Sequence, residues 1–258
     1  MLRRTVVLFI VLVLIAVAAP HSVQGASVRL VVSVAASLTD AIAEVKPLFE
    51  QAYPSVTLQF NFGSSGALQQ QIERGAPVDV FVSAAEAPIN HLVEKGLIAD
   101  GSVRHAAHNR LVLIRPTRPS RVLVDAWADL LGERVERVAI GNPEHVPAGV
   151  YAQRTLEFLG IWDHLRPKVI MGEDVRQTLQ YVRLGAVDAG IVYATDAATV
   201  SDVVVVAKAP DGSHPPVVYP VAPIRTSRHP GEAEAFVRFL LADEAQQILS
   251  KHGFVPAE

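Results

Sequence analysis

Four short segments of the chain combine small or hydroxyl side chains with the expected start of a helix, and none of them contains Lys or Arg. The first N–H groups of a helix have no partner within the helix, and the helix dipole places partial positive charge at the same end. Such a helix start can hold an anion through backbone donors alone. The sequence therefore predicts anion binding by backbone and hydroxyl donors. The four segments are 35–38, 63–66, 146–149 and 173–175.

Each segment also has an ordinary structural explanation. Ser37, followed three residues later by Asp40, fits a capping box. Ser64 and Ser65 fit simple helix caps, and Asp174 is a common N-cap residue. Taken singly, these signals do not separate a binding site from ordinary helix ends.

The elements that must position these segments alternate between short β-branched runs and helical stretches. Such alternation is typical of an α/β fold with largely parallel strands, in which ligands usually bind at the loops that follow the strands. Beyond residue 200 the order changes, because two extended runs flank a turn-rich stretch and two helices close the chain. This order can be made by a chain that builds one lobe, crosses to a second, and returns to finish the first. The strand-like runs are 29–34, 56–60, 78–83, 111–114, 138–140, 169–171, 189–192, 203–207 and 217–221, and the helical ones are 40–51, 67–74, 87–95, 127–131, 148–159, 175–184, 232–241 and 244–252.

The N-terminus predicts export. A pair of Arg residues precedes an uncharged apolar run at 6–19, which is followed by small residues. This is the pattern of a secretory signal peptide, and the run is shorter than the ~20 residues of a membrane-spanning helix. We assign 1–25 to the signal peptide, with cleavage after Gly25 or Ala26, and expect a soluble periplasmic protein. The alternative is an uncleaved membrane anchor.

Composition excludes several classes of protein. There is no Cys, so neither a disulfide framework nor a lipid-attached N-terminal Cys is available. Of 23 Lys and Arg residues, 21 remain without Arg3 and Arg4, against 26 Asp and Glu residues. No basic cluster suits a phosphate backbone, so nucleic acid is not an expected partner.

Six segments, taken together, resemble the periplasmic molybdate-binding proteins in sequence, order and spacing. The likeness covers nearly the whole chain after the signal peptide. Its most specific motif is Pro-Glu-His-Val-Pro-Ala-Gly at 143–149. The other segments are Val-Ala-Ala-Ser-Leu-Thr-Asp at 34–40, Asn-Phe-Gly-Ser-Ser-Gly-Ala-Leu at 61–68, Gly-Ala-Pro-Val-Asp-Val-Phe-Val-Ser at 75–83, Glu-Asp-Val-Arg at 173–176 and Gly-Ile-Val-Tyr-Ala-Thr-Asp at 190–196.

The resemblance implies an α/β, two-lobed periplasmic-binding-protein fold of the type II kind, with two crossover segments and a tetrahedral oxyanion in the cleft between the lobes. Residues 26–108 and 222–258 would form the first lobe and residues 109–221 the second. Molybdenum would be held as molybdate, through its oxygens, with no direct metal ligand from the protein and no cofactor. The implied donors are the hydroxyl and backbone N–H groups of Ser37 and Ser65, the backbone N–H groups of Ala148 and Val175, and the phenolic O–H of Tyr193.

The resemblance also implies a function without covalent chemistry. The protein would be a monomer that binds molybdate, and tungstate, with high affinity and delivers it to an ABC permease in the inner membrane. Glu173 and Asp174 would oppose an anion if they faced it, so we expect both to point away, or Asp174 to cap a helix. Arg176 fits a solvated helix residue.

The chemistry of the anion accounts for these residue types. Molybdate at neutral pH is a fully deprotonated dianion whose oxygens only accept hydrogen bonds, so its ideal pocket contains donors only. Protonated phosphate brings a donor of its own, and leaving that donor unpaired costs ~1–3 kcal/mol. Sulfate is also a bare tetrahedral dianion, so only cavity size would exclude it, and binding of another oxyanion such as sulfate stays an alternative.

Two further functions remain as alternatives. A hydrolase could use Ser65 with one of the nine His residues, although Gly-Ser-Ser-Gly at 63–66 is not the Gly-x-Ser-x-Gly nucleophile motif. A binding protein for an amino acid or peptide could use Tyr151, Trp127 and Trp162 as an apolar wall. The matched segments lack the charged partners that such a ligand needs.

Overall fold

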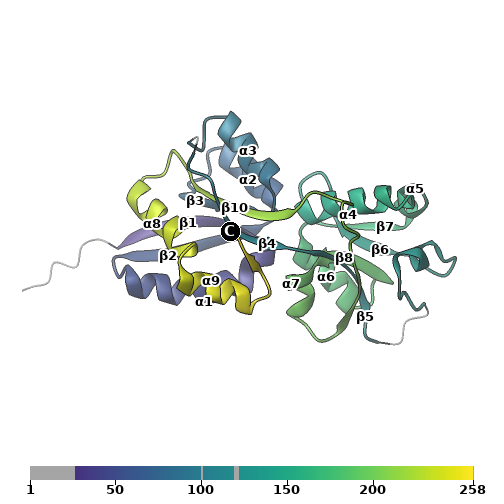
Figure 1. Ribbon diagram of the computed structural model, residues 1–258. Helices are drawn as coiled ribbons and strands as arrows, with labels where there is room; N and C mark the ends of the chain where they lie inside the picture. The colour runs from purple at the N-terminus through teal and green to yellow at the C-terminus, as the bar shows by residue number, and fades with distance from the viewer. Residues whose placement is uncertain (1–26, 100, 119–121, 258) are drawn as a thin grey trace, which may run out of the picture.

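The computed structural model describes residues 27–99, 101–118 and 122–257, so the predicted signal peptide lies outside the described residues. In these ranges the chain forms two α/β lobes, each with its own sheet (Figure 1). Within the same ranges, no helix combines the length and the apolar character needed to cross a membrane.

The first lobe contains a six-stranded sheet in the order β11-β4-β10-β3-β1-β2. Its first strand reads Val-Arg-Leu-Val-Val-Ser-Val-Ala, and its second half is buried on both faces, as expected for a strand inside a layered α/β sheet. Helices α1, α8 and α9 cover one side, where Phe49 of α1 packs edge-to-face on Phe236 of α8. Helices α2 and α3 pack together on the other side (Figure 1). The elements are β1 (Val28–Ala35), η1 (Ala36–Leu38), α1 (Thr39–Ala52), β2 (Val56–Gly63), α2 (Ser65–Glu73), β3 (Val80–Val82), α3 (Glu86–Glu94), β4 (Arg104–Asn109), β10 (Val217–Pro223), α8 (Pro230–Leu240), α9 (Asp243–Lys251) and β11 (Val255–Pro256).

The second lobe contains a five-stranded sheet in the order β7-β6-β8-β5-β9. Its helix α6 shows how the sequence selects the buried face, because Val175, Thr178, Leu179 and Val182 recur at helical spacing and are all buried. The elements are β5 (Leu111–Pro116), η2 (Trp127–Leu131), β6 (Val138–Gly141), α4 (Pro147–Phe158), α5 (Trp162–Leu165), η3 (Arg166–Lys168), β7 (Val169–Gly172), α6 (Val175–Arg183), β8 (Ala189–Tyr193), α7 (Ala194–Ala198) and β9 (Val203–Lys208).

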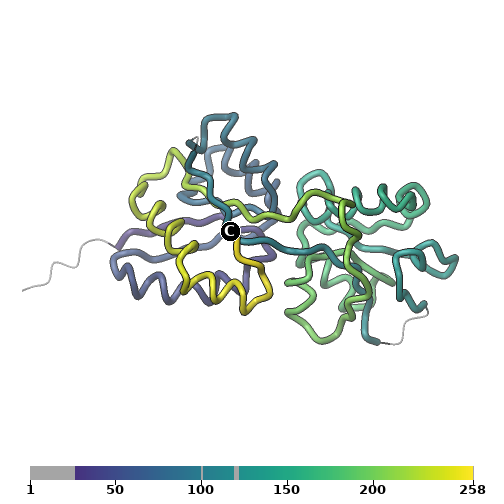
Figure 2. The backbone as a smooth tube through the Cα atoms, viewed as in Figure 1, coloured from purple at the N-terminus to yellow at the C-terminus, as the bar shows by residue number. Residues whose placement is uncertain are grey.

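Two segments connect the lobes (Figure 2). Strand β4 of the first sheet leads into β5 of the second with only Arg110 between them, and the return runs from β9 to β10 through 209–216. The expected lobe boundary after residue 221 falls inside β10, which pairs with β3 and β4 and so belongs to the first sheet. The apolar run at 217–221 is typical of a buried strand but does not indicate which sheet the strand joins.

The expectation of largely parallel strands is wrong, since both sheets are mixed. Strands β1, β2 and β3 are parallel to one another along their pairings, as are β6, β7 and β8, whereas β5 and β10 pair antiparallel with their neighbours. On entering each lobe, β5 and β10 run against the strands that the lobe's own helices connect, and β11 pairs antiparallel with β4 at the edge of the first sheet.

The parallel strands end in register. Ala35 at the end of β1 lies opposite Gly63 at the end of β2, and Gly141 at the end of β6 lies opposite Gly172 at the end of β7. The helices that follow these strands therefore begin side by side in each lobe. This places the four segments selected from the sequence at two neighbouring pairs of strand ends.

Candidate anion-binding site

The five predicted site residues lie at or just beyond these strand ends. Ser37 follows β1, and Ser65 follows β2, both in the first lobe. Ala148 and Val175 lie at the starts of the helices after β6 and β7, and Tyr193 ends β8, the other neighbour of β6 in the second lobe. All five are buried, the most exposed being Val175 at 4%. The structure thus places the five predicted residues in one region, to which both lobes contribute.

Backbone donors are available at three helix starts. Ser65 and Val175 are the first residues of α2 and α6, and Ala148 is the second residue of α4, after Pro147. Backbone N–H groups in the first turn have no acceptor inside their helix, and the helix dipole adds positive potential there. These N–H groups can therefore donate to a negatively charged ligand without a charged side chain.

The hydroxyl groups of Ser65 and Tyr193 meet across the lobes at one residue, Ala84. The Ser65 Oγ accepts a hydrogen bond from the Ala84 N–H at 2.9 Å. The Tyr193 hydroxyl donates to the carbonyl oxygen of Ala84 at 3.4 Å. Because the Ser65 oxygen already accepts, its own proton is free for another acceptor. Burial raises the pKa of Tyr193 well above its ordinary value, so this phenol is also a donor.

One direct connection between the lobes, here called the His145 contact, joins the start of α2 to the loop before α4. The Gly66 N–H donates to the carbonyl oxygen of His145 at 2.9 Å, and the Ser64 Oγ lies 2.8 Å from His145 Nδ1. A Cβ atom at position 66 would lie 2.6 Å from that carbonyl oxygen, which no real contact allows. Glycine at position 66 is therefore required for the two loops to touch.

A second connection, the Arg176 contact, joins the start of α6 to the start of α1. Arg176 Nη2 donates to the carbonyl oxygen of Ser37 at 3.2 Å, and Nη1 lies 2.8 Å from Asp40 Oδ2. Its Nε pairs at 2.6 Å with Asp196, a carboxyl with 0% exposure in the second lobe. Burial raises the pKa of Asp196 to about 7, against the opposing effect of the Arg176 guanidinium.

The expectation that Arg176 is a solvated helix residue is wrong, because its side chain is only 23% exposed and spans both lobes. Its partners Asp40 and Asp196 are far away in sequence, and no local pattern pairs them with it. The one available signal was a single basic residue directly after a proposed donor, at the segment 173–176.

The two acidic residues beside Val175 behave as expected. The Glu173 side chain is 78% exposed, and Asp174 is the N-cap of α6, where its Oδ1 accepts from the Gln177 N–H at 2.8 Å. A carboxylate held by the helix it caps does not compete for the donors inside the cleft. The negative charge of these residues is thereby kept at the rim.

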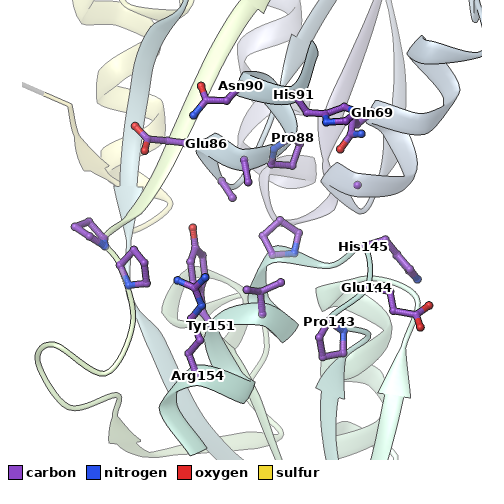
Figure 3. A pocket seen from close by; sticks show the side chains of 17 residues that line it. Gln69, Glu86, Pro88, Asn90, His91, Pro143, Glu144, His145, Tyr151 and Arg154 are labelled. Atoms are coloured by element: carbon purple, nitrogen blue, oxygen red, sulfur yellow. The ribbon is translucent and has the colours of Figure 1, made fainter. Parts of the chain in front are cut away.

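A cavity of about 530 Å³ adjoins the site between the lobes. Figure 3 shows Glu86 on the first-lobe side and Tyr151 and Arg154 on the opposite side. The cavity is lined by neighbours of the site residues, among them Gly66 and Pro147, rather than by the five residues themselves. Burial raises the pKa of Tyr151 to about 12, so this phenol is neutral.

The apolar wall proposed for an amino acid or peptide ligand is not assembled. Tyr151 lines the cavity, whereas Trp127 and Trp162 pack against the hydrophobic core of the second lobe. The Trp127 indole N–H donates to the Lys208 carbonyl at 3.0 Å. These tryptophans support the fold of their lobe.

Among the residues that the structure describes, the hydrolase arrangement around Ser65 is not assembled either. His145 bonds to Ser64 and not to Ser65, and its other ring nitrogen lies 3.6 Å from Glu173, beyond hydrogen-bond range. Ser64 is 5% exposed and belongs to the opposite lobe from His145. A nucleophile needs a base and an orienting acid in hydrogen-bond contact, which this set does not provide.

Comparison with known proteins agrees with this geometry. The family model of bacterial extracellular solute-binding proteins matches residues 30–255. YvgL of Bacillus subtilis, named as an ABC transporter substrate-binding lipoprotein, is 41% identical over 88% of this chain and 86% of its own length. The molybdate-binding protein ModA of Haemophilus influenzae is 36% identical over 89% of this chain and 91% of its own length.

The fold has solved counterparts as well. The periplasmic molybdate-binding protein of Azotobacter vinelandii superposes with a TM-score of 0.78, covering 89% of this chain and 100% of its own at 24% identity. This likeness confirms the predicted two-lobed fold. From the family match and the identity to its relatives, the chain belongs to the bacterial extracellular solute-binding proteins, a family of binding proteins and not of enzymes.

Proposed function

We propose that this protein binds molybdate, and tungstate, in the cleft between its lobes and delivers the anion from the periplasm to an ABC permease in the inner membrane. One observation carries the proposal. Five buried residues from both lobes offer N–H and O–H donors at one place, and none of the five has a charged side chain. The names of the relatives at 36% and 41% identity support the ligand and the transporter class.

The proposed roles follow from the donors that each residue has. Ser37 and Ser65 each supply a hydroxyl and a backbone N–H, and Ala148 and Val175 each supply a backbone N–H. Tyr193 supplies its phenolic O–H, which would turn from the Ala84 carbonyl to the anion on binding. A tetrahedral dianion has four oxygens that only accept, so every donor finds an acceptor. No carboxylate among the five could receive a proton from a ligand.

The proposed mechanism is closure around the anion. Either lobe alone holds only part of the donor set, so the anion is fully bonded only when the lobes meet. The His145 contact and the Arg176 contact join the lobes on either side of the donor set. A permease would recognise the closed arrangement.

The test is isothermal titration calorimetry of the purified protein with molybdate, tungstate, sulfate and phosphate. We expect tight binding of molybdate and tungstate only. A Ser37→Ala, Ser65→Ala double variant should bind molybdate about 100-fold more weakly or worse, since each hydroxyl bond to a charged group contributes about 1.5–3 kcal/mol. Ser250→Ala is the matched control, because Ser250 is exposed on α9 and should leave the affinity unchanged.

The other outcomes separate the alternatives. Tight binding of sulfate with no heat from molybdate would replace the proposed ligand by sulfate. No heat from any of the four anions would contradict the oxyanion proposal altogether. Unchanged affinity in the double variant would remove the two serines from the site.

A further inference from the structure

The amide group of Asn109 has a fixed orientation. Asn109 is the buried last residue of β4, and its Oδ1 accepts from the Arg110 backbone N–H at 2.8 Å. A backbone N–H can only donate, so the amide oxygen must face Arg110 and the NH₂ group must face the other way. That NH₂ group donates to Thr195 Oγ1 at 2.8 Å and to Tyr219 Oη at 3.1 Å.

The orientation of Asn109 determines the direction of the Tyr219 proton. Tyr219 lies on β10, has 0% exposure, and has its Oη 2.8 Å from the Oγ of Ser37. Because this oxygen accepts from Asn109, its single proton is left for Ser37. Burial raises the pKa of Tyr219 above its ordinary value, so the proton stays on the phenol.

Ser37 is the last member of this chain of hydrogen bonds. Its Oγ accepts from Tyr219, so its own proton is free for a different acceptor. The same logic holds for Ser65, whose oxygen accepts from the Ala84 N–H. Both serines at the site are therefore held as donors by neighbours that occupy their oxygens.

We propose that Asn109 and Tyr219 are positioning residues that turn the Ser37 hydroxyl into a hydrogen-bond donor toward the bound oxyanion. This inference rests on the proposed function. Its consequence is selectivity for fully deprotonated anions, because a protonated oxyanion would present its O–H to a hydroxyl whose own proton already faces it. A buried donor facing a donor leaves both unpaired, which is costly.

Asn109 and Tyr219 both lie close to the segments that connect the lobes. Asn109 and Tyr219 lie on the two strands that lead into the crossovers, and Asn109 also contacts Thr195 of the second lobe. The Ser37 hydroxyl of the first lobe is therefore oriented by residues that lie where the two lobes are connected. Figure 2 shows both crossover segments passing between the lobes, one in teal and one in yellow-green.

The test is a double-mutant cycle measured by titration calorimetry with molybdate. Tyr219→Phe keeps the ring, which packs edge-to-face on Phe254, and removes only the hydroxyl. We expect about tenfold weaker molybdate binding, because the Ser37 proton can then turn away from the anion. In a Ser37→Ala background the same change should cost nothing further, since Tyr219 acts through Ser37.

A purely structural role of Tyr219 predicts a different result. Loss of packing would weaken binding equally with and without Ser37, and that outcome would overturn the inference. Unchanged affinity of Tyr219→Phe alone would do the same. If the unaltered protein bound neither molybdate nor tungstate, the proposed function itself would be wrong.

A second variant covers the case in which Tyr219→Phe does not fold. Asn109→Leu removes the donor that orients the Tyr219 proton and keeps a side chain of similar size. We expect Asn109→Leu to weaken molybdate binding. In the Ser37→Ala background, the same substitution should have no further effect on affinity. In both variants, displacement of bound molybdate should need less inorganic phosphate than in the unaltered protein, and an unchanged requirement would contradict the selectivity.

Discussion

Two of the contacts that join the lobes, the Arg176 contact and the His145 contact, are built from different chemistry. The Arg176 contact uses a guanidinium shared between a buried carboxyl of its own lobe, Asp196, and Asp40 of the other lobe. The His145 contact uses a backbone hydrogen bond from Gly66 and a side-chain pair with Ser64. One contact depends on charge and the other on the close approach of two backbones.

The difference bears on the proposed anion site, whose five donor residues carry no charged side chain. Arg176 lies next to the proposed donor Val175, yet two carboxyl groups occupy its guanidinium. Its charge therefore holds the lobes together and does not attract any anion indiscriminately. The His145 contact instead sets the distance between the loops that carry Ser65 and Ala148. The three predictions below test this division of roles.

The largest expected effect is on stability, from Arg176→Met. Removing the guanidinium leaves Asp196 buried without its cation, so the free energy of unfolding at pH 8 should fall by about 2–3 kcal/mol. Urea denaturation measures the change. Arg183→Met is the control on the same helix, since its pair with Asp202 is partly exposed and its loss should leave the free energy of unfolding nearly unchanged.

The pH dependence of this effect has a definite sign. Because the pKa of Asp196 is raised to about 7, the folded protein holds a proton on this carboxyl in a pH range where the unfolded chain has lost it. The contribution of Asp196 to stability is thus fully present below its unfolded pKa and falls as the pH rises through about 7. The cost of Arg176→Met should accordingly be smaller at pH 5 than at pH 8, and an equal cost at both would contradict the role of Asp196.

A smaller effect is expected on binding, from Gly66→Ala. The added methyl group would meet the His145 backbone and keep the lobes from closing, while alanine suits the interior of α2. Molybdate affinity should fall about tenfold or more, because the closed state would become less favourable relative to the open state. Calorimetry measures the affinity, and small-angle scattering with molybdate should show a larger radius of gyration than for the unaltered protein.

The matched control is Gly231→Ala, since a Cβ at position 231 meets nothing within 4 Å and this glycine lies in the first turn of α8. It should bind molybdate as the unaltered protein does. If Gly66→Ala bound equally well, the His145 contact would have no part in closure.

The smallest effect is expected from Asp40→Asn. It weakens one of the two bonds by which Arg176 reaches the first lobe and leaves the bond to the Ser37 carbonyl in place, and the Asp40 side chain is 48% exposed. Molybdate affinity should fall about threefold, with little change in stability, as for other exposed ion pairs. Glu44→Gln on the same helix is the control, because Glu44 pairs within the first lobe with Lys251 and His252. A similar loss in both variants would point to a general charge effect instead of a contact between the lobes.

Much of this fold follows from local pattern. The helix starts at Pro147, Val175 and Ser65 were predictable because prolines, caps and glycines act within a few residues. Strand β4 escaped prediction, since Arg-His-Ala-Ala-His-Asn at 104–109 has few β-branched residues and becomes a strand through pairing with β10 and β11. From the sequence we placed 217–221 in the second lobe, because the apolar pattern of a buried strand does not indicate which strands it pairs with.

The candidate site also has features that local sequence determines and features that only the tertiary structure decides. The sequence by itself determined which groups are offered, namely helix-start N–H groups and hydroxyls without charge, because these depend on neighbouring residues. Only the tertiary structure decided that the two lobes bring them together, that Arg176 reaches Ser37, and that the Ser37 proton is left free. Ser37 and the Tyr219 that orients it are 182 residues apart, and local backbone preferences act over only a few residues. Such a pair is formed by the packing of the whole chain, which no local pattern records.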